Sequence, residues 1–178
     1  MKNILILIFF LTLSTQLFAQ CEYEFKGMDE LEKKEKVQTK DVQVMNPSSG
    51  LPVAFLSLGR LGTEYFICVK LNLDNSVCID AESELTISTD TTVAIKLRKQ
   101  GKTKDCSHPS NKGGVSFQYV ELFYSVPAKT LEELSVRELR KIRISSSESN
   151  IDLMFGVKNL NKNLAYPFFK ESVKCVLQ

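Results

Sequence analysis

Alternation of apolar and polar residues is the strongest pattern along this chain, and it predicts a fold rich in β-strands. The alternation is clearest over residues 65–73, where Ile67, Val69 and Leu71 share one face of the predicted strand. An apolar segment over 53–58 precedes it. The glycines within 59–62 are expected to break the chain between these two strands, so that they form an antiparallel pair.

The same pattern recurs in shorter segments. Additional strands are predicted over 37–45, 77–80, 115–126, 140–145 and 151–157. Segments 85–88 and 93–98 flank a polar stretch and are expected to form a hairpin with β-branched residues on both arms. The polar segment 100–114 is predicted to be a long loop. The mixed-charge run 30–36 is interpreted as a solvated turn or a short helix.

Basic residues gather after this hairpin. Their exposed charges are expected to protect a sheet edge from pairing with neighbouring strands, and a patch for an anionic ligand is the alternative. These residues are Lys96, Arg98, Lys99, Lys102 and Lys104.

Two helices interrupt the strand pattern. A capping box, Thr130 followed by Glu133, predicts a short helix beginning at Thr130, with Leu131 and Leu134 facing inward. Pro167 suits the first position of a C-terminal helix, because its missing N–H would be unpaired there. The predicted fold is therefore α+β: mainly antiparallel, sandwich-like sheet with a helix between strands and one at the C-terminus.

The N-terminal residues read as an export signal. Lys2 precedes an apolar run over 4–13, and a polar stretch leads to Ala19. We expect cleavage after Ala19, a signal peptide over 1–19 and one β-rich domain over 20–178. The apolar run is about ten residues long, whereas a spanning helix needs roughly 20, so no transmembrane segment is expected in the mature chain. The expected location is periplasmic or secreted.

Cysteine usage fits export, because an oxidising compartment permits disulfides. The chain holds five cysteines, an odd number. Cys68, Cys78, Cys106 and Cys175 are the predicted disulfide cysteines, with the pairing left open. The alternative for Cys21 is lipidation as the first residue of a lipoprotein, although Gln20 fits that signal poorly.

Charge and motifs restrict the function. With 23 basic and 21 acidic residues, the chain lacks the basic excess of a nucleic-acid-binding protein. Cys106 and His108 in a polar loop are a weak catalytic pair, and a single histidine does not supply a zinc site. The oxygen-rich cluster Asp74, Asn75, Asp80, Glu82 and Glu84 matches no EF-hand spacing and is interpreted as solvated turn. We predict no catalytic, metal-binding or cofactor-binding residue and no cofactor.

A strand–short helix–strand unit spans Tyr124–Pro127, Thr130–Leu134 and Lys141–Ile144. It resembles small, uncharacterised exported proteins of Bacteroidota-type bacteria, as does the end of the signal at Ala19. Residues 90–92 also resemble the O-glycosylation sequon of that group, which makes Thr91 a candidate glycosylation site. The resemblance implies an envelope location and no particular activity.

These observations favour a non-catalytic envelope module that binds an unknown protein or envelope component, or has a structural role. One alternative is a carrier that holds an apolar molecule between the sheet and the C-terminal helix. Another is a hydrolase acting on envelope polymers, with carboxylates brought together by the fold. An apolar cavity beneath Phe168 and Phe169 would favour the carrier, and two buried carboxylates facing each other across a cleft would favour the hydrolase. A filled core with an exposed patch would favour the binding module.

Overall fold

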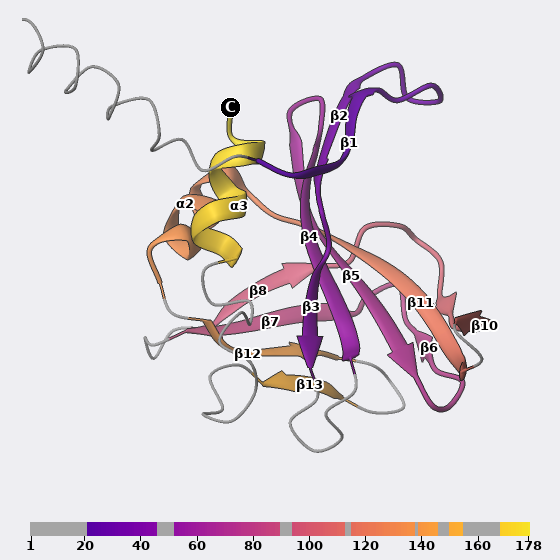
Figure 1. The fold of residues 1–178 in the computed structure, drawn as a ribbon. Helices are drawn as coiled ribbons and strands as arrows, with labels where there is room; N and C mark the ends of the chain where they lie inside the picture. The colour runs from indigo at the N-terminus through magenta and orange to yellow at the C-terminus, as the bar shows by residue number, and fades with distance from the viewer. Residues whose placement is uncertain are drawn as a thin grey trace, which may run out of the picture.

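The computed structural model describes residues 21–45, 52–89, 94–112, 115–137, 139–145, 150–154 and 168–178. Within these residues the protein is mainly antiparallel β-sheet with two short helices, one between strands and one at the C-terminus (Figure 1). This confirms the predicted combination of antiparallel strands with few helices. The predicted signal peptide, Thr91 and Pro167 lie outside the described residues.

The larger sheet provides most of the framework. Its strands lie in the order β1 (Tyr23–Met28), β2 (Glu35–Thr39), β4 (Pro52–Leu61), β5 (Glu64–Leu73), β11 (Val115–Ser125) and β10 (His108–Lys112). A further strand, β3 (Val42–Met45), also pairs with β4. The single strand predicted over 37–45 is thus two strands, β2 and β3, which pair with opposite ends of β4. The chain leaves β2 at Lys40, whose N–H donates to the carbonyl of Glu22 at 3.0 Å.

The pairing of β4 with β5 confirms the predicted hairpin, but β4 is longer than expected. It continues through Gly59 to Leu61, and the turn is confined to the two residues that follow. Gly59 lies opposite Phe66, and a Cβ atom at position 59 would overlap the Phe66 ring. Glycine is therefore used here for close packing within a strand. The actual turn residue is Gly62, with φ of +59°.

Two smaller sheets complete the β-structure. One has the order β13 (Ile151–Met154), β12 (Leu139–Ile144), β7 (Glu84–Thr89) and β8 (Ile95–Arg98); the other pairs β6 (Cys78–Ile79) with β9 (Asp105–Cys106). The β7–β8 and β12–β13 pairings confirm two antiparallel predictions. The predicted loop over 100–114 was wrong in part, because it contains β9 and β10. Pro109 is tolerated in β10 because that strand lies at the edge of the sheet.

The two helices pack on each other and close one end of the core. Helix α2 (Ala128–Ser135) buries Leu131 and Leu134 as predicted. It begins two residues before Thr130, with Pro127 at its N-cap and no side-chain cap, so the predicted capping box was wrong. The N–H groups of Thr130 and Leu131 instead donate to the Pro127 carbonyl. Helix α3 (Phe168–Val176) packs against α2, β4 and β2.

One apolar core joins both main sheets and both helices. The inward set predicted for β5, Ile67, Val69 and Leu71, is fully buried and lies in the same core as Ile142 and Phe169. The predicted sandwich-like stacking is not confirmed: the larger sheet is curled, and the strands of the four-stranded sheet run across the direction of β3 and β4 (Figure 1). Among the helices in the described part of the chain, none has the length and apolarity needed to cross a membrane.

Two disulfides connect distant parts of the chain, Cys21 with Cys175 and Cys78 with Cys106. The prediction of disulfides is confirmed, but the bonded set differs from the predicted one at two cysteines, Cys68 and Cys21. Cys68 is a buried free thiol, because it lies in the middle of β5 with no second cysteine opposite it in β4 or β11. Cys21 takes its place and joins the start of the described chain to α3. The sulfur in this bond is the atom that lipidation would use, so the disulfide and the lipoprotein alternative exclude each other.

Candidate functional site

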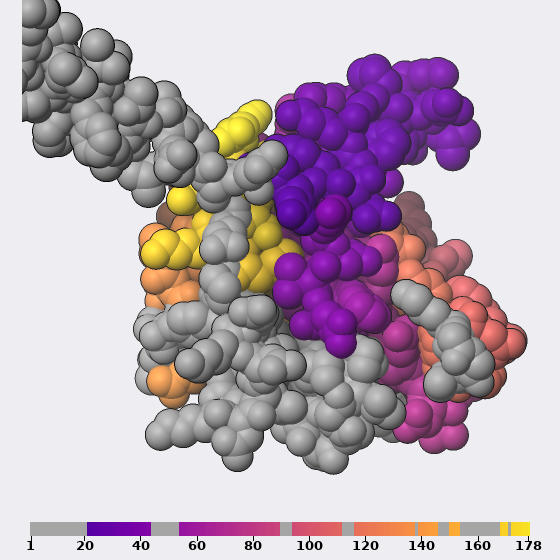
Figure 2. All heavy atoms as spheres, viewed as in Figure 1, coloured from indigo at the N-terminus to yellow at the C-terminus, as the bar shows by residue number. Residues whose placement is uncertain are grey.

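The β1–β2 hairpin projects from the rest of the protein, as Figures 1 and 2 show in indigo. The mixed-charge run over 30–36, expected to be a solvated turn or a short helix, forms most of its turn and the first two residues of β2. The Asp29 carboxylate accepts hydrogen bonds from the N–H groups of Leu31 and Glu32 at 3.0 and 2.9 Å. The hydrogen bond from Glu32 is the main reason that the pKa of Asp29 is lowered. The turn is therefore ordered by its own sequence.

Large apolar side chains are exposed on this hairpin. Phe25, Met28 and Leu31 are 41%, 62% and 92% exposed. Among the described residues, the one other large hydrophobic of this kind is Val136 at the end of α2, at 84%. The Lys36 ammonium lies 5.7 Å from the centroid of the Phe25 ring. Three of four such residues thus lie on one small projection, where contact with a partner would bury them.

A pocket of about 540 Å³ lies beside the turn end of the hairpin, where Asp29 and Lys36 line it. This volume is within the range of small-ligand and side-chain sites. Four segments that are far apart in the sequence contribute to it. The lining residues are Asp29, Lys36, Leu61, Glu64, Phe66, Gln100, Gly101, Phe123 and Ser125. We call these residues, together with Phe25, Met28 and Leu31, the hairpin–pocket surface.

Two aromatic rings and Leu61 form the apolar part of the pocket. Phe66 on β5 and Phe123 on β11 meet edge to face, with ring centroids 5.6 Å apart. The missing side chain of Gly59 leaves room for the Phe66 ring above β4. The sequence therefore builds this part of the pocket by placing a glycine opposite a phenylalanine.

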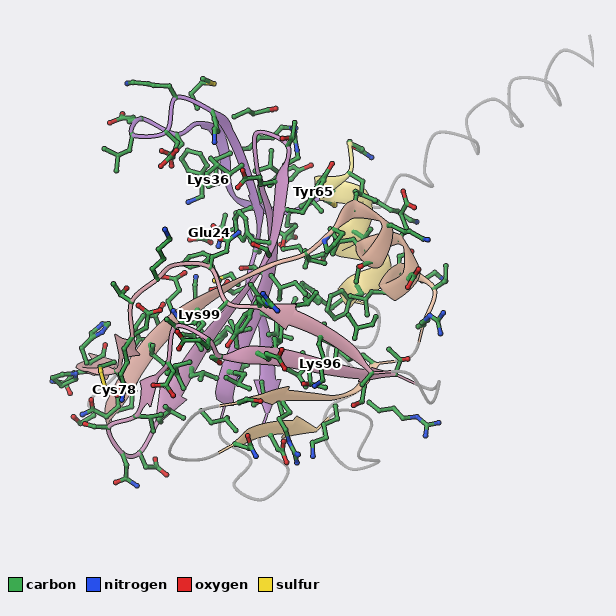
Figure 3. The ribbon with its side chains drawn as sticks, turned by 180° about the vertical axis from the view of Figure 1, so that it is seen from behind. Glu24, Lys36, Tyr65, Cys78, Lys96 and Lys99 are labelled. Carbon is green, nitrogen blue, oxygen red and sulfur yellow. A yellow bond between two sulfur atoms is a disulfide. The ribbon has the colours of Figure 1, made fainter. Side chains whose placement is uncertain are left out.

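The side of the pocket next to Phe123 is held in place by a buried lysine, since the N–H of the following residue, Gln100, donates to the Phe123 carbonyl at 2.6 Å. The side chain of Lys99 is 0% exposed; its ammonium pairs with Asp105 at 2.7 Å and donates to the Thr103 carbonyl at 3.0 Å. This fixes the segment that supplies Gln100, whose side-chain amide donates to Ser125 Oγ at 3.0 Å. The prediction that Lys99 protects a sheet edge was wrong, because its charge is enclosed within the fold (labelled in Figure 3).

The polar rim of the pocket carries both signs of charge. Lys36 (labelled in Figure 3) and Glu64 line it from different hairpins. Neither has an ion-pair partner among the described residues, whereas neighbouring Arg60 pairs with Glu35 at 3.0 Å. A ligand that places an apolar group on the two rings can therefore meet an ammonium and a carboxylate at the rim.

A polar cluster continues along the same face of β5, beyond Phe66. Lys70 pairs with Asp41 at 2.6 Å and lies 3.9 Å from Glu121. Burial alone would lower the pKa of Lys70, but the hydrogen bond and charge of Asp41 raise it above its usual value. The Cys68 thiol donates to Glu121 at 3.2 Å. Burial, and then Glu121, raise the pKa of Cys68, so the thiol stays protonated and unreactive.

The residues weighed for chemistry in the sequence do not converge on one site. Cys106 is in a disulfide, and His108 lies against the Tyr119 ring at 5.3 Å. Asp80 and Glu84, from the oxygen-rich cluster, pair with Lys104 and Lys96. Within the described residues no group of three or more acidic, histidine or cysteine side chains is arranged to hold a metal ion.

Sequence reasoning missed the hairpin–pocket surface. β1 was not predicted, although its apolar residues alternate with Glu24 and Lys26 and immediately precede the charged turn. That alternation beside a charge run was the available signal. The pocket had no comparable signal, because its residues become neighbours only through the sheet order. Comparison with family models, with curated proteins and with solved structures finds no match to this chain, so its site is interpreted from its own geometry.

Proposed function

We propose that this protein is an exported, non-catalytic binding module that engages a partner protein through the hairpin–pocket surface. The observation that carries the proposal is the position of Phe25, Met28 and Leu31, exposed on one projection beside a pocket with an aromatic floor. Exposed apolar residues that gather beside a pocket are typical of interaction sites.

The chemistry of the surface describes the partner. Phe66 and Phe123 accept one apolar side chain, and Lys36 and Glu64 accept opposite charges on either side of it. We propose a partner segment that inserts an aromatic or branched apolar residue flanked by charged residues. The projecting apolar residues of the hairpin then cover further apolar surface of the partner.

Neither alternative function gains support from the described residues. Phe168 and Phe169, beneath which a carrier would hold its ligand, are themselves buried in the core. Asp41 and Glu121 are two partly buried carboxylates that both interact with Lys70. Such a cluster stabilises strands and leaves no free acid–base pair for hydrolysis.

Export is part of the proposal. Its support is the signal-like pattern over residues 1–19 and the two disulfides, which form and persist in oxidising compartments. The resemblance to exported proteins of Bacteroidota-type bacteria makes the bacterial envelope the proposed location of the partner.

Site-specific photo-crosslinking in the native envelope tests the proposal. The photoreactive residue p-benzoylphenylalanine replaces Leu31 in one variant and Val136 in a matched control, since both side chains are large, apolar and exposed. We expect Leu31→p-benzoylphenylalanine to form one discrete adduct with another protein, identified by mass spectrometry, and the Val136 variant to form none.

A second substitution tests the pocket separately. Adding Lys36→Glu to the Leu31 variant should reduce the adduct, because it reverses the charge at the rim without removing a buried apolar group. A discrete adduct from Val136 and none from Leu31 would refute the proposal. An adduct from Leu31 that is unaffected by Lys36→Glu would remove the pocket from the binding surface.

A further inference from the structure

We propose that the Cys78–Cys106 disulfide is a redox switch for the pocket: a dithiol reduces it in the folded protein, and the pocket-lining segment at Gln100 and Gly101 then moves away. The switch regulates the same surface as the proposed function, and its effect on partner binding rests on that function. Its support is the exposure of the bond and a chain of contacts that leads from Cys106 to the pocket.

The two disulfides differ in exposure. Cys106 is exposed and Cys78 is partly exposed, and Figure 3 shows their bond at the periphery of the ribbon. Cys175, in the other disulfide, is only 8% exposed. A thiolate must reach a sulfur atom in order to exchange with it. An external reductant therefore reaches the Cys78–Cys106 bond first.

Reduction proceeds by thiol–disulfide exchange. One thiolate of the dithiol attacks the exposed Cys106 sulfur, forms a mixed disulfide with it and displaces Cys78 as a thiolate, which takes up a proton. The second thiol of the dithiol loses its proton and attacks the dithiol sulfur of the mixed disulfide, which releases Cys106 as a thiolate that is protonated in turn. The dithiol leaves as a disulfide, and the protein has gained two electrons and two protons. Reduced Cys-X-X-Cys motifs of disulfide oxidoreductases are dithiols of this kind.

Only short-range contacts hold β9 to β6 once the bond is reduced. The ladder between them has two residue pairs. Next to it, Ser107 and Val77 share two hydrogen bonds, at 2.8 and 3.0 Å, and the partly exposed pair Lys104–Asp80 is 3.7 Å apart. The disulfide closes a loop of 28 residues, which regains conformational freedom on reduction. Because two-stranded ladders are marginally stable in water, β9 depends on the covalent bond to stay in place.

Asp105 transmits the loss of β9 to a buried charge. It precedes Cys106 in β9 and pairs with Lys99 at 2.7 Å. The side chain of Lys99 is 0% exposed, so its ammonium depends on this carboxylate. A buried ammonium that loses its counter-charge is strongly unfavourable. When β9 moves away, Lys99 therefore turns toward water.

The movement of Lys99 reaches the pocket through the next two residues. Gln100 and Gly101 both line the pocket. The Lys99 N–H donates to the Ser83 carbonyl at 3.1 Å, and the Gln100 N–H donates to the Phe123 carbonyl at 2.6 Å. A segment that follows Lys99 outward gives up both hydrogen bonds. The oxidised protein thus keeps this side of the pocket in place, and the reduced protein releases it.

Reduction without denaturant tests the first step. The oxidised mature chain is incubated with dithiothreitol and alkylated over time, and its peptides are measured by mass spectrometry. We expect Cys78 and Cys106 to be alkylated about tenfold faster than Cys21 and Cys175. The buried free thiol of Cys68 should stay unmodified, which verifies that the protein is still folded. Reduction of Cys21–Cys175 at an equal or faster rate would overturn the inference.

Amide hydrogen exchange measured by NMR tests the second step. C78S/C106S represents the reduced protein, and C21S/C175S is the matched control that lacks the other bond. We expect the Gln100 amide to exchange about tenfold faster in C78S/C106S, relative to the amides at the centre of β5, and to be unchanged in C21S/C175S. The β5 amides also verify that each variant is folded. Unchanged exchange at Gln100 in C78S/C106S, or an equal rise in both variants, would contradict the switch.

Lys99→Met tests the transmission. It removes the buried charge and keeps an apolar side chain of similar length, so the segment no longer has a charge to expose. Adding Lys99→Met to C78S/C106S should therefore restore slow exchange at Gln100. If the triple variant exchanges as fast as C78S/C106S, Lys99 does not transmit the change and the inference is wrong.

Hydrogen exchange is measured without a partner, so it tests the switch apart from the proposed function. A protected Gln100 amide in C78S/C106S, together with a protein adduct at Leu31→p-benzoylphenylalanine, would overturn the switch and leave the proposed function standing. Fast exchange at Gln100 in C78S/C106S without any Leu31 adduct would support the switch as a property of the pocket and refute the proposed function.

Discussion

The β1–β2 hairpin and the region around α3 use apolar residues in opposite ways. Helix α3 buries Phe168, Phe169 and Val173 in the core, whereas the hairpin exposes Phe25, Met28 and Leu31. The two regions adjoin, because the Tyr23 hydroxyl at the start of β1 donates to the Cys175 carbonyl at 3.4 Å. Val37 of the same hairpin is part of the core, so the fold is completed without Phe25, Met28 and Leu31 in particular, and these three residues remain for contact with another molecule.

The largest expected effect is in the core. Phe169→Ala should lower the free energy of unfolding by about 3–5 kcal/mol, because it removes a buried ring and leaves a cavity. Leu31→Ala should change it by less than about 0.5 kcal/mol, as expected for an exposed position. Urea unfolding of both variants measures the contrast. A loss at Leu31 comparable to that at Phe169 would show that the hairpin belongs to the core.

Removal of the Cys21–Cys175 disulfide should have the next largest effect. C21S/C175S opens a loop of 154 residues. Loop entropy predicts that the free energy of unfolding falls by about 5 kcal/mol at most, and losses of about 2–5 kcal/mol are typical when a native disulfide is removed. C78S/C106S opens a loop of 28 residues and should cost about 1.5 kcal/mol less. Chemical unfolding without reductant compares them. An equal or larger loss in C78S/C106S would contradict the entropic account of the terminal disulfide.

The polar cluster beside the pocket should contribute less. Lys70→Met leaves Asp41 and Glu121 without their shared cation and should cost about 1–3 kcal/mol, below the value for a fully buried pair. Lys34→Met on the hairpin is the control, since Lys34 and Glu32 are exposed and 4.0 Å apart; the expected change is less than about 0.5 kcal/mol. If both variants unfold at the same denaturant concentration, the cluster does not stabilise the sheet.

The smallest effect is expected on the four-stranded sheet. Arg143 donates two hydrogen bonds to Asp152, at 2.7 and 2.8 Å, and these hold the pKa of that carboxyl below its usual value. The stability from this pair is therefore present above the ordinary carboxyl pKa of about 3.9 and is lost as the pH falls below it. Asp152→Asn should cost less than about 1 kcal/mol at neutral pH. The variant should also lose less stability than the unchanged protein as the pH falls below about 4. If the two proteins lose the same stability over this pH range, the Arg143–Asp152 pair does not stabilise the fold.

The sequence predicted those elements whose alternation reflects burial on one side. β5 and β12 were predictable because Ile67, Val69 and Ile142 face one core while Lys70 and Arg143 do not. β1 was missed because most of its residues are exposed and only Tyr23, at its start, packs against the core. The end of β4 was misplaced because glycine usually marks a turn, whereas Gly59 stays in the strand and makes room for Phe66. The start of α2 was misplaced because threonine often caps a helix, whereas Thr130 lies within α2 and the N-cap is Pro127.

The candidate site was harder to predict than the fold. Disulfide pairing depends on which strands and helices meet, and Cys21 and Cys175 are 154 residues apart. Lys99 could not be distinguished from its exposed neighbours, because the carboxylate that neutralises it belongs to β9, a strand hidden in an apparent loop. Recognition of the pocket needed the order of the larger sheet, which alternation alone does not specify.

The central claim is that the hairpin is left exposed by folding and covered by binding. Hydroxyl-radical footprinting of Met28 tests it most directly, because methionine oxidises readily and its oxidised peptide is measured by mass spectrometry. The protein is compared in dilute purified form and in its native envelope, with Val136 as the exposed reference. We expect Met28 to be oxidised in the purified protein and protected in the envelope, while Val136 reacts equally in both. Equal oxidation of Met28 in the two samples would contradict the account.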